Sequence, residues 1–158
     1  MRHSEAIRAI LTLLQNCELA SDRDFSAASD HAFYSTVALK DAYPLADQSI
    51  PCLAFSNAGG SNLRKGLGDA DQWHQPRVQV DVLADSALEA RRIYEKVAEI
   101  LRYDYNGDGS GAAGSYGKHY LRDQGVKDVE LGEPRQAVWD EEGRVARLVA
   151  DAVLTFQD

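Results

Sequence analysis

The stretch that decides the fold is residues 76–103, PRVQVDVLADSALEARRIYEKVAEILRY. Apolar and polar residues alternate in its first part, at the period of a half-buried strand: Val78, Val80 and Val82. Ser86 then precedes Glu89 by three residues, a spacing typical of a capping box at the start of a helix. The helix that follows carries one apolar stripe: Ala90, Ile93, Val97, Ile100 and Leu101. We therefore expect a strand and a helix that cover each other's apolar faces, with no catalytic chemistry in either.

The rest of the chain supplies further elements around this unit. An apolar stripe with Ser4 as N-cap predicts an N-terminal helix over about 4–15. Residues 33–39 favour a strand, with a helix as the alternative. Residues 50–56 indicate a second strand, bounded by prolines. We interpret the glycine-rich stretches 57–71 and 104–118 as flexible loops that dock onto partners.

The C-terminal end predicts a hairpin whose second strand is unusually long. Residues 140–143, Asp-Glu-Glu-Gly, are a good turn, and the strand over 144–156 would span roughly 44 Å. Arg147 and Asp151 lie among valines on its second face, so this face needs a neighbour, for which another subunit is a candidate. Arg147 and Asp151 are therefore candidate protein-interface residues.

These patterns together define a fold class. We expect α+β: a mostly antiparallel twisted sheet of about four to five strands, packed against one long helix at about 86–103. An N-terminal helix and the C-terminal β-hairpin complete a single domain over 1–158. A chain of this length buries a real core without disulfide staples. Cys17 and Cys52 are better read as two thiols than as a disulfide.

Charge and hydropathy exclude several function classes. The net charge of −8 argues against tight non-specific binding of nucleic acid, although it is compatible with a protein that DNA only passes through. No apolar run approaches the roughly 20 residues that span a bilayer. Glu5, Arg8 and Gln15 interrupt the N-terminal apolar stretch and argue against a signal peptide. We expect an intracellular protein with no membrane partner.

One constellation has the residue types of a cation site. Asp104, Asn106 and Asp108 match the first half of a calcium loop, with Gly109 at the sixth position. The twelfth position is Ser115 instead of the bidentate glutamate, so we favour an exit turn after the helix, with a weak metal site as the alternative.

No pattern of a nucleophile, a nucleotide-binding loop or a paired metal site is convincing. The letters GxGxxG at 109–114 follow a helix instead of a strand, which is the wrong context for a dinucleotide. Arg64 and Lys65 form a small basic patch, sufficient for one acidic contact on a partner protein. We expect no enzyme activity and no cofactor.

The order of these elements resembles the tail-terminator family, the small tail-completion or neck proteins of long-tailed viruses of bacteria and archaea. The strongest match is VQVDVLADSALEARRIYEKVAEIL, in which Glu89 and Ala90 open the helix, and the second is the final hairpin ending in AVLTF at 152–156. Together they cover about half the chain. Residues 18–43 are longer than the resemblance leads us to expect, and we interpret them as an insertion or an added hairpin.

The resemblance implies a structural protein of the virion. Such proteins form a ring, implied here to be a homo-hexamer, that caps the tail tube and joins it to a head-completion or connector protein. Genome DNA passes through the ring without sequence-specific binding. Assembly would take place in the host cytoplasm. Two alternatives stay open: another neck or minor tail protein such as a head-completion stopper, and a small α/β ligand-binding domain or enzyme.

Overall fold

One mixed sheet organises the fold, in the order β1-β2-β3-β7-β5, with β6 also paired to β7. The computed structural model describes residues 3–16, 38–44, 50–64, 72–102, 121–139 and 144–157. The strands are β1 (Ala38–Lys40), β2 (Cys52–Arg64), β3 (Gln72–Ala84), β5 (Val126–Leu131), β6 (Arg135–Ala137) and β7 (Ala146–Gln157). All pairs are antiparallel except β1 with β2. The expected α+β class with a mostly antiparallel sheet is confirmed, and the sheet has six strands.

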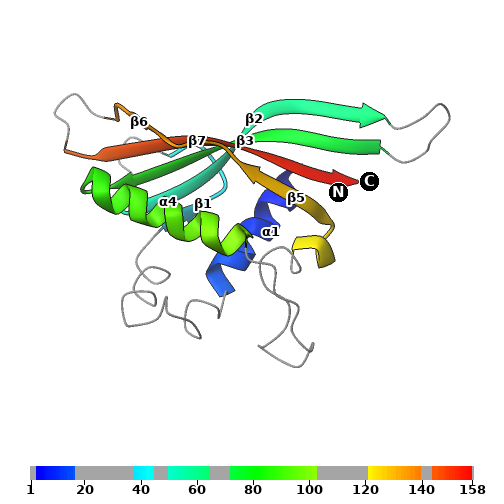
Figure 1. Cartoon of the computed structure of the whole chain (residues 1–158), viewed down its shortest axis with the longest axis horizontal. Helices are drawn as coiled ribbons and strands as arrows, with labels where there is room; N and C mark the ends of the chain where they lie inside the picture. Colours follow the sequence, from blue (N-terminus) through cyan, green and yellow to red (C-terminus); the bar gives the residue numbers. More distant parts are fainter. Residues whose placement is uncertain are drawn as a thin grey trace.

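Both long helices lie on the same face of this sheet (Figure 1). They are α1 (His3–Asn16) and α4 (Ala87–Arg102), close to the ranges that the apolar stripes predicted. The core between helices and sheet contains the predicted valines of β3 together with Phe55 and Phe156, all buried. None of the helices in the described ranges is long and apolar enough to cross a membrane.

The start of α4 has half of the predicted capping box. The backbone N–H of Glu89 donates to the Ser86 hydroxyl oxygen at 3.1 Å, and the N–H of Ala90 donates to the Ser86 carbonyl at 3.0 Å. Because Ser86 satisfies a free donor of the first turn, the chain can leave β3 and enter the helix after only two residues, Asp85 and Ser86.

The strand β2 is much longer than the sequence indicated. A loop was expected over 57–71, but β2 continues to Arg64 and pairs with β3 as far as Gln72, so this prediction is wrong for 57–64. Residues 65–71 lie outside the described ranges. A β-bulge accommodates the glycines: Gly59 has a positive φ of 101°, and its N–H donates to the Asn57 side-chain oxygen at 3.0 Å. Pairing with β3 therefore overrides the low strand propensity of this segment.

The far halves of β2 and β3, residues 56–64 and 72–77, form a hairpin that we call the arm. Its β3 side is held to the body of the protein by aromatic rings. The His74 ring stacks on Phe156 with centroids 5.1 Å apart, and His3 of α1 meets Phe156 edge-on at 5.7 Å. In Figure 1 the arm runs to one end of the molecule, away from β6 at the other end.

The C-terminal strand is long, as predicted, and central. β7 pairs with β3 on one side and with β5 and β6 on the other, so both of its edges are largely filled within the chain. β6 and β7 form the expected hairpin, whose turn lies outside the described residues. Of the strand predicted over 33–39, the structure describes only its end, as β1 at 38–40, and most of the proposed insertion 18–43 also lies outside.

Candidate functional site

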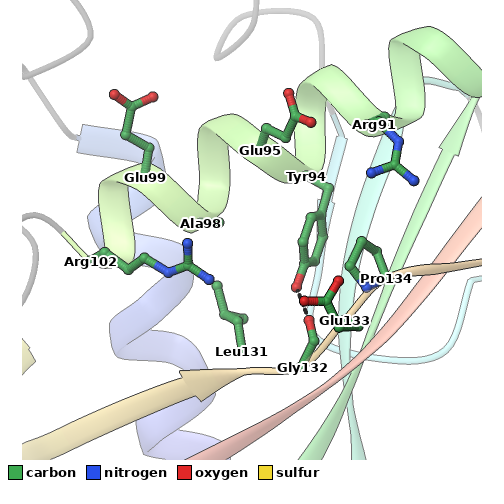
Figure 2. A pocket seen from close by; sticks show the side chains of 10 residues that line it. All are labelled: Arg91, Tyr94, Glu95, Ala98, Glu99, Arg102, Leu131, Gly132, Glu133 and Pro134. Atoms are coloured by element: carbon green, nitrogen blue, oxygen red, sulfur yellow. Dashed lines mark hydrogen bonds between the residues drawn. The ribbon is translucent and has the colours of Figure 1, made fainter.

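A groove separates α4 from the connection between β5 and β6 (Figure 2). Its volume is about 580 Å³. Residues 131–134 form the strand side, and α4 contributes six residues: Arg91, Tyr94, Glu95, Ala98, Glu99 and Arg102. Side chains three and four positions apart lie above one another on one face of a helix, so these six residues form one wall of the groove.

Tyr94 and Gly132 hold the two walls of the groove together. The Tyr94 hydroxyl donates to the Gly132 carbonyl oxygen at 2.6 Å, a contact drawn as a dashed line in Figure 2. The N–H of Gly132 donates in the other direction, to the Asp151 carbonyl of β7 at 2.7 Å. A Cβ at position 132 would lie 3.0 Å from that same carbonyl oxygen, so glycine permits the close approach.

The Tyr94 hydroxyl is kept neutral by its surroundings. Burial raises its pKa above the ordinary value of 10.0. Arg102 opposes this shift, and the carboxylate of Glu133 adds to it. A neutral phenol that donates to a carbonyl is a structural group, and none of the described residues that line the groove is a serine, cysteine or histidine that could act as a nucleophile or base with it.

The rim of the groove is charged and exposed. In Figure 2, Glu95 and Glu99 point away from the strand, whereas Arg91 and Arg102 reach down towards it. Between these charges the floor is apolar, formed by Ala98 and Leu131 with the tyrosine ring. An apolar floor with a charged rim is the arrangement of a protein-binding groove.

The opposite face of the sheet carries a buried ion pair. Arg147 of β7 contacts one carboxylate oxygen of Asp81 twice, through Nη2 at 2.7 Å and Nε at 2.8 Å. The Asp81 side chain is 0% exposed, and the amide of Gln79 donates to its second oxygen at 2.8 Å. The guanidinium lies 5.5 Å from the Tyr43 ring centre and 5.6 Å from that of Trp139.

This ion pair lies beside a small apolar cluster, separate from the main core, that contains Cys52, Ala54 and Leu83. Burial raises the pKa of the Cys52 thiol to about 11. Lys40 opposes the shift, and the Asp81 carboxylate adds to it. The thiol is free and protonated at neutral pH, which makes it a packing group and a poor nucleophile.

The two predicted interface residues on β7 differ in their surroundings. Arg147 interacts within its own chain with Asp81 and two aromatic rings. Asp151 lies at the surface, where Arg77 Nη2 is 3.1 Å from its carboxylate. Arg64 is the last residue of β2. Lys65 and the cation-site candidates Asp104, Asn106 and Asp108 lie outside the described residues. The interface role of these residues and the cation site stay predictions.

Sequence reasoning missed the groove and the Asp81 pair. Tyr94 lies next to the apolar stripe of α4. No pattern in the sequence around Gly132 indicates a contact with this tyrosine, which lies 38 positions earlier. Asp81 alternates with the buried valines of β3, and this alternation alone does not indicate that its carboxylate is buried. Within the described ranges, no group of three or more His, Cys, Asp and Glu is placed to hold a metal ion.

The fold is that of a single-domain α+β protein with a charged-rimmed groove beside α4. No protein-family profile matches the sequence, and no curated protein matches it. Thirty chains of solved structures match the fold. One is a chain from the virion of a native gene transfer agent particle, with a TM-score of 0.54 and 12% identity over 96% of this chain and 94% of that one. At this identity the likeness is one of fold.

Proposed function

We propose that this chain is a structural protein of a virus-like particle and works as a tail terminator. The observation that carries the proposal is the near full-length likeness to a chain of a gene transfer agent virion, in which each chain covers more than nine tenths of the other. The motif resemblance of residues 78–101 and of the C-terminal hairpin to tail terminators supports the same assignment, independently of the fold.

In this role, copies of the chain assemble into a ring, by resemblance a hexamer, that caps the tail tube. The other side of the ring joins a head-completion or connector protein, and genome DNA passes through the central hole. The net charge of −8 suits such a passage, because an acidic wall repels the phosphate backbone and lets it slide. The groove beside α4 and the arm are candidate contact surfaces within such an assembly.

The main alternative is another neck protein, such as a head-completion stopper built from similar α+β parts. The two roles differ in the partner: a terminator binds the end of a tail tube, and a stopper binds the portal side of the head. An enzyme or a ligand-binding domain is less well supported, because the groove of the described residues has a charged rim and no nucleophile–base pair.

The test is negative-stain imaging of the purified protein, with light scattering and binding to purified tail tubes and to portal complexes. A ring with a central hole that binds tube ends is the expected result. Binding to portals alone would replace the terminator by the stopper. A strict monomer that binds neither would overturn the proposal.

A further inference from the structure

The outer edge of β2 along the arm is unpaired in the part of the chain that the structure describes. β1 covers β2 only at 52–54, and on its inner side β2 pairs with β3 along the whole arm. The backbone groups of 55–64 that point outward therefore meet no described strand. A row of such groups on an open sheet edge is a template for another strand.

Apart from the bulge at Gly59, this edge lacks the features that usually keep an edge strand single. Residues 56–63, SNAGGSNL, contain no charged residue and no proline, whereas proteins protect free edges with lysine, other charges or proline. The bulge at Gly59 bends the strand but leaves β2 paired beyond it as far as Arg64. The edge is therefore suited to pairing with another chain.

The arm also differs in charge from the rest of the protein. Its described residues, 56–64 and 72–77, contain Arg64 and Arg77 and no acidic residue, in a chain of net charge −8. The described strands of the arm are therefore basic on an acidic protein, although Arg77 is already paired with Asp151, and they are a candidate for contact with an acidic surface.

Such a surface lies along the other edge of the sheet. Among the described strands, β5 pairs only with β7, so its other edge is open. The groove beside α4 begins where β5 ends, at Leu131. Five acidic residues surround this edge and groove, against three basic ones. The acidic ones are Glu95, Glu99, Asp128, Glu130 and Glu133. A groove between a helix and an edge strand is a geometry that accepts an added extended strand.

We infer that the arm of one copy of this chain lies against the α4–β5 groove of the next copy, with its free β2 edge beside β5 and the β5–β6 connection. The inference rests on the proposed ring in taking the partner to be a second copy. Arm and groove are different surfaces, and Figure 1 shows the arm extending away from α4, so the contact joins two copies head to tail. Head-to-tail contacts generate closed rings when the rotation closes.

Two paired variants test this contact. The arm variant Ser61→Asp/Arg64→Glu makes the arm acidic, and the groove variant Glu95→Lys/Glu133→Lys makes the exposed rim basic. The control Asp85→Lys reverses an exposed acid that lies outside both the arm and the groove. Circular dichroism and melting temperature check that each variant folds. Ala58→Asp, at an exposed position of the bulge, tests the same edge if the arm variant does not fold.

Light scattering of wild type, of each variant and of a mixture gives the readout. Wild type and control should form rings, and each variant alone should associate at least about tenfold more weakly, as expected when opposite charges become like charges. The mixture should regain association into rings of alternating copies, because the unaltered arm of one variant meets the unaltered groove of the other and the acidic arm meets the basic groove.

Three results would overturn the inference. Rings formed by either variant alone would show that its altered surface is not needed, and the terminator proposal would still stand. A mixture that stays monomeric would exclude the head-to-tail contact. If the groove variant alone forms dimers and the arm variant alone does not, the contact is β2–β2 pairing between two arms instead. A wild type that is monomeric also overturns the inference, and tail-tube binding then decides the proposed function separately.

Discussion

Arg147 binds a single oxygen of Asp81 twice, across the neighbouring strands β7 and β3, on the sheet face that the helices leave uncovered. The Asp81 side chain is fully buried, and the Arg147 side chain is 15% exposed, with its guanidinium next to two aromatic rings. Burial of a charge is costly unless it is paired and hydrogen-bonded, so each partner depends on the other.

Replacing Arg147 should therefore affect folding first. We expect Arg147→Met to lower the free energy of unfolding by about 3–5 kcal/mol, because Asp81 is left as an unpaired buried charge. The double variant Asp81→Leu/Arg147→Met should recover most of that loss, since no charge is left buried. Urea denaturation of the two variants measures the difference, and equal losses would show that the pair is not coupled.

Asp151 provides a matched contrast on the same strand. Its ion pair with Arg77 is exposed, and exposed pairs contribute about 0.2–1 kcal/mol. Asp151→Asn should thus change the urea midpoint little. If Asp151 is an interface residue, the same variant should weaken self-association in light scattering. Loss of stability beyond about 2 kcal/mol would mean that Asp151 has a role within the subunit.

The Tyr94 hydroxyl should make stability fall at high pH. The pKa of Tyr94 is higher in the folded protein than its ordinary value of 10.0 in the unfolded chain. The contribution of Tyr94 to the free energy of unfolding is therefore complete below pH 10.0 and is lost as the pH rises through the pKa of the folded protein. Tyr94→Phe should lower stability by about 0.5–1.5 kcal/mol at neutral pH, through loss of the bond to Gly132, and should show a shallower decline above pH 10.0. Thermal melts of both proteins across this range provide the test, and parallel curves would contradict it.

Two glycines should respond differently to the same substitutions. Gly132→Ala places a Cβ 3.0 Å from the Asp151 carbonyl and should cost about 1–3 kcal/mol by overpacking. At Gly59 a Cβ meets nothing within 4 Å, and the cost of alanine, about 1–2 kcal/mol, comes from the positive φ. Asparagine tolerates this φ, so Gly59→Asn should be milder than Gly59→Ala, whereas Gly132→Asn should be no better than Gly132→Ala.

The Cys52 thiol should resist alkylation in the folded protein. It is buried, and with a pKa of about 11 almost none of it is thiolate at pH 8. In a Cys17→Ser background, iodoacetamide should label Cys52 only after denaturant is added. Rapid labelling without denaturant would show that the cluster around Cys52 opens readily.

The sequence predicted what depends on local spacing. The valines of β3, the Ser86 cap and the stripe of α4 are each readable within a few residues, and the structure has all three. The far half of β2 was missed because its glycines and asparagines have low strand propensity, and only pairing with 72–76 makes them a strand. The groove was missed because Tyr94 and Gly132 are brought together by the tertiary fold alone.

The position of both long helices on one face of the sheet has a consequence for any wall made from this subunit. A strand added beside β5 extends the sheet in its own plane, so successive copies would present their helices on the same side. The opposite side would be a continuous β-surface bearing Gln79, Asp151 and Thr155. Such a wall has an inside and an outside that differ in chemistry, and the direction in which the copies curve decides whether passing cargo meets the helix side or the strand side.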